Sequence, residues 1–455
     1  MSEVETGFRA YLKFVLKSKS ALAAFAVIIF LVGLAAYVNS MPSSISFNFL
    51  NKPAYWAATY PADAAPNWMA ALEPSVYTPT LYLVPSKVEL YHRVGQTYIY
   101  ELTYSFEWPS LKQATDVTFS FSGNATIQQL VIVWRKPSGS DVNISMTVGS
   151  TVSSFDLSGV QNALLNYIYE KTGTTPTVVT TNVLAEALFN KLTKAGVGPA
   201  ERGTYTVAVY LVTLGPEKFK TAEIRVLGNA YGYMGTDYYG RPILLGILLG
   251  LPNALEIGVV TSLLGVLIGT FVGGFAGFLG GKTDAALNWF STVILALPAL
   301  PFLVTLGMVL RSGLSIMSEA LLITFLSWPF YAIIARSSAQ SIRTNAYVEA
   351  DRLMGIPSYR TFFTHFIPRL VPFIVAYTVL GIPGAILLVE TLAFIGIAPP
   401  NIVTWGYLLD QAYANNAALN GWWWWILFPG LMIIIVSVPF VIVGFTIERA
   451  AFGGR

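Results

Sequence analysis

The sequence contains no cysteine, only two histidines, and few charged residues for its length. The absence of thiols excludes disulfides, thiol catalysis and Cys-ligated zinc or iron–sulfur sites. His92 and His365 are too few for a multi-histidine metal site. Only 11% of the 455 residues are charged, whereas an average soluble protein has about 25%. So little charge excludes a disordered tail and an ordinary water-soluble enzyme.

Apolar residues are abundant instead. They form 54% of the chain and the mean hydropathy is +0.59, which indicates a membrane protein. The net charge of +3 is too small, beside so much apolar surface, to indicate a nucleic-acid partner. A helix rises about 1.5 Å per residue, so apolar runs of roughly 20 residues are candidates to cross a bilayer. We expect six transmembrane helices, at residues 21–38, 254–279, 289–310, 320–335, 371–397 and 422–447.

The distribution of basic residues predicts the orientation. An even number of spans puts both ends of the chain on one side, and Lys and Arg are enriched in cytoplasmic segments. No small-residue cleavage pattern follows residues 21–38, so we expect a retained span and not a signal peptide. Arg311 is the one basic residue in the short loops of the opposite side. The set predicted to be cytoplasmic, together with both termini, includes Arg9, Lys13, Lys17, Lys19, Lys282, Arg336, Arg343, Arg352, Arg360, Arg369, Arg449 and Arg455.

A large segment between the first two spans has a different character. Across residues 41–229, polar and apolar residues roughly alternate in runs such as 88–106 and 115–134, which is the period of a β-strand. A helical interruption is expected near residues 160–194. Nothing in this segment is apolar for long enough to cross a bilayer. We therefore predict an extracytoplasmic, mainly-β (α+β) insert domain.

Two local patterns within the insert suggest more specific features. Asn124 and Asn143 begin Asn-X-Thr/Ser sequons and are candidate glycosylation sites, although two matches in a Ser/Thr-rich region can arise by chance. Tyr205 follows Gly203 in a pattern similar to the tyrosine corner of β-sandwiches. The alternative is a glycine turn before an edge strand.

Within the spans, acids and glycines are the informative residues. Glu256 and Glu390 lie in predicted spans, where burying an acid costs about 2–3 kcal/mol, so each is a candidate for the transport pathway or a hydrogen-bonded structural acid. Glycine recurs every fourth residue in the second span, which predicts close packing of another helix. The stripe comprises Gly265, Gly269, Gly273 and Gly277. The phosphate-loop-like run at 276–283 follows a span and not a strand, so we expect no nucleotide site there.

The cytoplasmic segment between the fourth and fifth spans is the most informative. Gly355 is placed to end one short helix in a left-handed cap, and Pro357 favours the start of a second helix. A short, basic helix pair that is continuous with two spans is suited to docking a cytoplasmic partner. A solvated loop would not need a helix-ending glycine followed by a helix-starting proline.

This segment resembles the EAA loop of ABC importer permeases, and His365 with Ile367-Pro368 is similar to the dipeptide/oligopeptide branch of that family. Further matches are the G-T-D-x-x-G-R signature before the second span, the fifth span with Glu390, and Trp405-Gly406 after it. The coupling-loop residues are Glu349, Ala350, Asp351, Arg352, Gly355, Pro357, His365, Ile367 and Pro368, and the signature residues are Gly235, Thr236, Asp237, Gly240 and Arg241.

Three residues differ from the family pattern. Asp351 replaces the second alanine of E-A-A, Pro242 replaces an aspartate, and Arg369 stands where the branch usually has asparagine. The resemblance covers the N-terminal tail, the first span and the chain from about Met234 to its end, and it does not cover the insert.

The resemblance implies a type I ABC importer permease fold in the cell membrane of a prokaryote. It implies a second permease subunit, two cytoplasmic ATPases that hold ATP and magnesium, and an external solute-binding protein, with no catalytic, metal or cofactor site in this chain. Peptides are the branch's usual cargo; oligosaccharides or nickel, and an ion-coupled secondary transporter, are the alternatives.

We accordingly divide the chain into six segments. They are a cytoplasmic tail (1–20), a first span (21–38), the insert (41–229), a motif-bearing linker (230–253), a five-helix core (254–447) that contains the coupling loop (343–369), and a cytoplasmic C-terminus (448–455).

Overall fold

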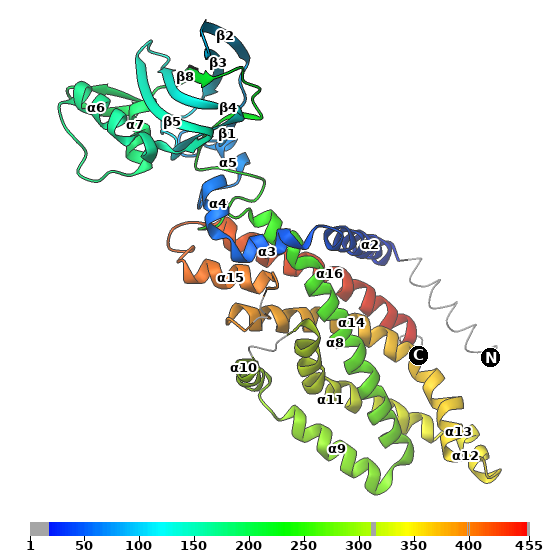
Figure 1. The fold of residues 1–455 in the computed structure, drawn as a ribbon. Helices are drawn as coiled ribbons and strands as arrows, with labels where there is room; N and C mark the ends of the chain where they lie inside the picture. Colours follow the sequence, from blue (N-terminus) through cyan, green and yellow to red (C-terminus); the bar gives the residue numbers. More distant parts are fainter. Residues whose placement is uncertain (1–17, 311–314, 398, 400, 453–455) are drawn as a thin grey trace. The chain divides into compact units, whose positions relative to one another are not determined.

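The computed structural model describes residues 18–310, 315–397, 399 and 401–452 (Figure 1). Arg9, Lys13, Lys17, Arg311 and Arg455 of the orientation argument lie outside these residues. The chain divides into two compact units. The helical unit comprises the described residues up to Lys52 and those from Leu245 onward, and the sheet unit is Pro53–Leu244.

Five helical segments in the described residues are long and apolar enough to cross a membrane. Their apolar residues continue around much of the helix surface, as expected for helices that face lipid and neighbouring helices. They are α2 (Lys19–Asn39), α8 (Ile243–Leu279), α11 (Ile316–Arg343), Ser358–Phe394, whose last part is α14 (Ile367–Phe394), and α16 (Trp423–Phe452). The shorter helices of the helical unit are α3 (Ser43–Asn51), α12 (Ala346–Leu353), α13 (Ser358–Thr361) and α15 (Trp405–Ala414).

The predicted span 289–310 is not one straight helix. It consists of α9 (Gly281–Leu295) and α10 (Ala299–Val309), which meet at an angle of 76°. Pro298 lies at the break, at the cap position of α10, because proline cannot donate the hydrogen bond that would continue α9. If this bent pair counts as one span, the described residues contain up to six candidates. The second span also differs, since α8 begins at Ile243 and not at residue 254, and continues through Pro252.

The glycine stripe of α8 packs against α11, as its spacing predicted. A Cβ on Gly269 would lie 2.5 Å from the carbonyl oxygen of Trp328, and one on Gly273 would overlap the carbonyl of Ala332. A Cβ on Gly277 would lie 2.5 Å from the carbonyl oxygen of Arg336. The absence of side chains therefore allows the backbones of α8 and α11 to approach closely.

The sheet unit is built on a seven-stranded antiparallel sheet. Its strand order is β1-β9-β4-β8-β3-β2, and β5 pairs with part of β4. The strands are β1 (Leu81–Leu83), β2 (Lys87–Val94), β3 (Thr97–Trp108), β4 (Asp116–Arg135), β5 (Asp141–Phe155), β8 (Gly203–Leu214) and β9 (Thr221–Leu227), and β6 (Asn190–Thr193) with β7 (Gly196–Ala200) forms a separate hairpin. The unit also contains the helices α4 (Pro53–Thr59), α5 (Asn67–Leu72), α6 (Gln161–Thr172) and α7 (Thr181–Phe189), and the 3₁₀ turn Leu157–Val160.

The core of this unit lies between the sheet and two helices. Alternate residues of β4 and β8 are buried on one face, because successive side chains of a strand point to opposite sides. Figure 1 shows α6 and α7 beside the sheet, where α7 contacts β4 and α6 contacts β5. The aromatic part of the core includes Trp108, Trp134, Phe189 and Tyr205, which are fully buried.

Tyr205 tests the two interpretations of its motif. Its hydroxyl donates to the carbonyl oxygen of Glu201 (2.7 Å) and lies 3.1 Å from that of Phe189. This local bond is the contact of a tyrosine corner. The alternative of an edge strand is wrong, since β8 lies between β4 and β3.

Candidate functional site

The hairpin of α12 and α13, residues 346–361, has the local geometry that its sequence predicted. Gly355 has φ 71°, the left-handed conformation that glycine adopts without strain. The amide of Ile356 donates to the carbonyl of Asp351 (3.0 Å), and the amide of Gly355 donates to that of Arg352 (3.2 Å). These two bonds form a Schellman cap, which confirms the predicted end of the first helix. Pro357 occupies the cap position before α13.

Asp351 joins the two arms of this hairpin. Its side chain is buried, and its carboxylate accepts a hydrogen bond from the hydroxyl of Thr361 (3.0 Å). The same carboxylate oxygen lies 3.1 Å from Nε2 of His365. The aspartate that departs from the E-A-A pattern thus has a contact that alanine could not make.

The hairpin also has an apolar core that extends into the spans. Val348 and Phe362 are buried together with Ala339 of α11. Phe366, in the π-helical turn Phe362–Phe366, packs edge-on against Phe278 of α8 with ring centroids 4.4 Å apart. The hairpin is therefore fixed on the ends of α8 and α11. Ile367 packs against the same core, and Pro368 lies in the first turn of α14.

The outer surface of the hairpin combines charged and apolar side chains. Glu349, Ala350 and Arg352 are exposed, as are Leu353 (83%) and Met354 (68%). A pocket of about 250 Å³ opens beside them, lined by residues that include Phe278, Arg343, Val348, Glu349, Arg352 and Thr361. This face of the hairpin therefore presents both apolar and charged side chains to solvent.

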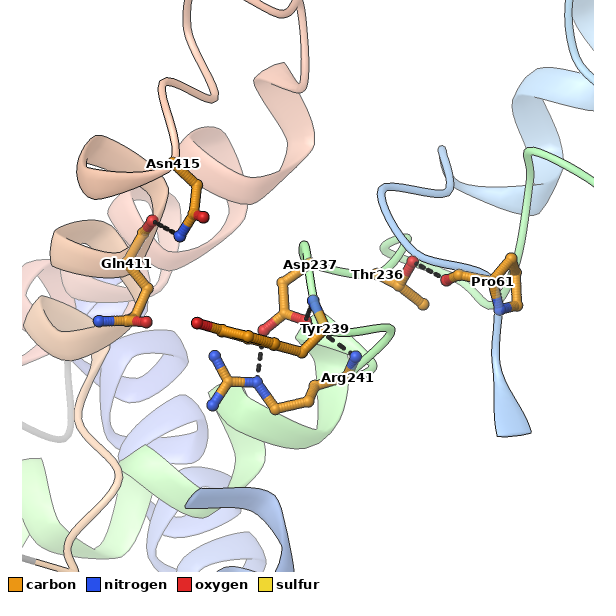
Figure 2. Close-up of polar contacts among 7 residues, drawn as sticks. All are labelled: Pro61, Thr236, Asp237, Tyr239, Arg241, Gln411 and Asn415. Carbon is orange, nitrogen blue, oxygen red and sulfur yellow. Dashed lines mark hydrogen bonds and ion pairs between the residues drawn. The ribbon is translucent and has the colours of Figure 1, made fainter. Parts of the chain in front are cut away.

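The signature residues before α8 form a tight turn in the sheet unit (Figure 2). Gly235 and Gly240 have φ values of 77° and 76°, and a Cβ on Gly240 would lie 2.7 Å from the carbonyl oxygen of Tyr60. The hydroxyl of Thr236 donates to the carbonyl of Pro61 (2.6 Å). Both glycines are therefore required by the backbone.

Asp237 and Arg241 form a buried ion pair at the centre of this turn. Nε of Arg241 lies 2.6 Å from one carboxylate oxygen, and the other oxygen accepts from the amides of Tyr239 and Arg241 at 2.9 Å each. Burial, together with the charge of Asp237, raises the pKa of Asp63 to about 7. Within the sheet unit, the contacts of Asp237 and Arg241 stabilise the turn itself.

The two predicted intramembrane acids occupy different environments. Glu256 is exposed on α8. Glu390 is buried on α14, and its carboxylate accepts the amide of Gly406 at the start of α15. A Cβ on Gly406 would overlap the carbonyl of Glu390, so only glycine permits this approach. Trp405 donates from its indole to the carbonyl of Ile247 on α8 (3.0 Å). Glu390 therefore has the hydrogen-bonded structural contact that was one of the two interpretations.

A third acid was missed by the sequence analysis. Glu319, in the first turn of α11, is 2% exposed, and its carboxyl group interacts electrostatically with that of Glu390. It stands one residue before the predicted span 320–335, so its position at the edge of an apolar run was the available signal.

The two sequons occupy different positions on the sheet. The side-chain carbonyl of Asn124 accepts the amide of Lys218 (2.5 Å), and its amide lies 3.4 Å from the carbonyl of Pro216. Asn143 is exposed on β5.

Comparison with known proteins identifies the family. Residues 265–451 match the model for the binding-protein-dependent transport system inner membrane component. The chain is 29% identical over 217 residues to the probable D,D-dipeptide transport system permease protein DdpC of Escherichia coli K12, which covers 48% of this chain and 71% of the relative. It is 32% identical over 213 residues to the oligopeptide transport system permease protein OppC of the same strain, with 47% and 69% covered. The OppC of Bacillus subtilis 168 is 30% identical over 213 residues, with 47% and 68% covered.

Proposed function

The chain belongs to the family of binding-protein-dependent transport system inner membrane components, and from this premise we propose that it is one membrane subunit of an ATP-driven importer of short peptides. The relatives named above are permeases of dipeptide and oligopeptide systems. Oligosaccharides and nickel are the less favoured cargoes, because these three relatives are named as dipeptide or oligopeptide permeases.

We infer a topology of six spans, in which α9 and α10 together form the third. Both termini are cytoplasmic and the sheet unit is extracytoplasmic. The Lys and Arg distribution supports this orientation, because basic residues gather near the hairpin and in the N-terminal tail. The external position makes the sheet unit a candidate to receive the binding protein.

In this proposal the coupling hairpin, residues 346–361, is the part of the chain that binds the ATPase subunit. In this proposal, the exposed face with Glu349, Arg352 and Leu353 seats in a cleft of a cytoplasmic ATPase subunit. The apolar core of the hairpin, which includes residues of α8 and α11, makes it a rigid extension of the spans. Closure of the ATPase pair then moves those spans, and the coupling energy comes from different contacts in the two ATPase states.

Three kinds of partner complete this machine. A second, homologous permease supplies the other half of the pathway, two ATPase subunits hold ATP and magnesium, and an external solute-binding protein delivers the cargo. In this scheme the chain has no catalytic or cofactor site of its own and binds no nucleic acid.

An ion-coupled secondary transporter is the alternative of another class. It would use buried acids as coupling groups, and Glu390 and Glu319 are buried. The observation that favours the ATP-driven machine is the capped hairpin, since a secondary transporter needs no docking element. Purification decides between them, because the first class carries ATPase subunits with it and the second transports without them.

The hairpin assignment is tested by two substitutions. Gly355→Pro removes the left-handed cap, and Glu349→Lys reverses a charge on the exposed face. Both variants should insert normally and abolish ATP-dependent peptide uptake by vesicles that contain the full complex. Glu170→Lys, an exposed charge reversal on α6, is the matched control. Normal uptake by both hairpin variants would refute the assignment.

A further inference from the structure

A partly buried ion pair connects the bent third span to the helix that precedes the coupling hairpin. The carboxylate of Asp284, in the first turn of α9, accepts two hydrogen bonds from the guanidinium of Arg336 on α11. The second of these, from Nη2, is 2.7 Å long. The side-chain amide of Gln340, one turn further along α11, lies 3.2 Å from the same carboxylate. Asp284 thus holds two side chains of α11 at once.

This connection lies close to the hairpin. Helix α11 ends at Arg343 and α12 begins at Ala346. Ala339, which is in the same part of α11, is buried in the hairpin core. A displacement of the hairpin would therefore be applied to the turns of α11 that Asp284 contacts.

The link from α8 to α9 allows little independent movement. Gly280 and Gly281 both have positive φ, at 69° and 61°. A Cβ on Gly280 would overlap the guanidinium of Arg343, so the last side chain of α11 packs directly on this turn. Together with the glycine stripe, these contacts hold the ends of α8, α9 and α11 together.

Along the covalent chain, α9 is connected to the hairpin only through α10 and α11. The first half of the bent span is joined to α10 through the break at Pro298, where the direction changes by 76°. Movement of α11 reaches α9 directly where side chains join the first turn of α9 to α11. A bidentate Arg–carboxylate pair is suited to this role, because it fixes orientation as well as distance.

We propose that Asp284 is a positioning residue that, through Arg336, makes α9 move with α11 and the coupling hairpin, so that the motion of the ATPases reaches the bent third span. This inference rests on the proposed function. Asp284 does not contact substrate or nucleotide in this scheme, and its effect is on the coupling between ATP hydrolysis and transport.

The first experiment measures peptide uptake per ATP hydrolysed by the complete complex in proteoliposomes. Asp284→Asn and Arg336→Gln should each lower this ratio about fivefold to tenfold, within the usual range of coupling effects, while ATP is still hydrolysed. The exchange Asp284→Arg with Arg336→Asp should restore part of it. Lys282→Gln is the matched control, since this charge lies on the same turn of α9 and is not in any ion pair of the described residues. A normal ratio in both single variants would overturn the proposal.

The second experiment measures the movement of α9 relative to α11 directly and does not depend on transport activity. Because the chain has no cysteine, Ala285→Cys and Ser341→Cys provide the only thiols for spin labels in this subunit, on exposed positions of α9 and α11. The distance between the labels should be the same in the nucleotide-free and ATP-bound complex, and should become state-dependent when Asp284→Asn is added. A state-dependent distance in the labelled parent, or an unchanged one with Asp284→Asn, would overturn the proposal.

Failure of the proposed function would look different. In that case the unmodified complex would show no ATP-dependent peptide uptake, or Gly355→Pro would leave uptake intact. If Gly355→Pro abolishes uptake and Asp284→Asn does not change the coupling ratio, the hairpin assignment stands and only the role of Asp284 is refuted.

Discussion

Lys136 is a buried lysine in the sheet unit, where a charged ammonium group is unfavourable. It directly follows β4 and is 3% exposed. Nζ donates one hydrogen bond, to the carbonyl of Asn190 (2.6 Å), and lies 5.5 Å from the centre of the Tyr167 ring. Burial, the dominant effect, lowers the pKa of Lys136 from 10.5 to about 8. The folded unit therefore disfavours the charged form.

The lowered pKa predicts that the sheet unit becomes more stable as the pH rises. Between about pH 8 and 10.5, the unfolded chain keeps the proton on Lys136 and the folded chain releases it, so the unfolded state binds more protons and the free energy of unfolding increases with pH. Each pKa unit corresponds to about 1.4 kcal/mol. The penalty is about 3 kcal/mol at pH 7 and about 1 kcal/mol at pH 9.5, which leaves a gain of about 2 kcal/mol between these values.

Hydrogen–deuterium exchange of the β4 and β8 amides in the full-length protein measures this gain, after correction for the intrinsic exchange rate at each pH. The comparison is with Lys136→Met, which has a neutral side chain of similar length and should lack the pH-dependent increase. Lys191→Met, an exposed lysine of the same unit, should behave as the parent does. The reasoning fails if the parent and Lys136→Met show the same change between pH 7 and pH 9.5.

Three further predictions follow from single contacts. Asp351→Leu should lower the free energy of local opening in the coupling hairpin, measured by amide exchange, by about 1–3 kcal/mol, because it leaves the hydroxyl of Thr361 without its acceptor. Asp351→Asn should preserve most of the protection. Gly273→Ala should prevent normal packing of α8 on α11 and lower the melting temperature of the detergent-solubilised protein, whereas Gly430→Ala, with open space around its Cβ position, should not. Glu390→Gln can still accept the amide of Gly406, so it should retain the melting temperature, while Glu390→Leu should lower stability by about 1–3 kcal/mol. Equal behaviour within either of the first two pairs, or between the two Glu390 variants, would contradict the corresponding contact.

Local rules account for the features that the sequence predicted best. The cap at Gly355 depends on one residue that tolerates positive φ, and the glycine spacing on α8 depends on the helical period. Strand alternation in residues 115–134 corresponds to β4. These features are set by neighbours within a few residues, so a linear pattern contains the information.

The sequence predicted the bend between α9 and α10 only in part. Pro298 marks a place where a helix cannot continue unchanged, but a proline within a span also occurs in helices that are merely kinked. The apolar run 289–310 is continuous across the bend, so hydropathy alone predicted one element. Contacts of α9 and α10 with other helices decide the angle.

Composition, hydropathy and short motifs by themselves determined that this is a membrane protein, that its chain contains a sheet-forming segment, and that a capped hairpin follows the apolar helix α11. Only the tertiary structure decided which side chains meet, such as Asp284 with Arg336 and Glu390 with the first turn of α15. The physical reason is that periodicity specifies which side of a helix or strand is apolar, whereas the partner of a buried charge is chosen by how distant segments pack. A local sequence pattern therefore does not predict which residue pairs with a buried charge.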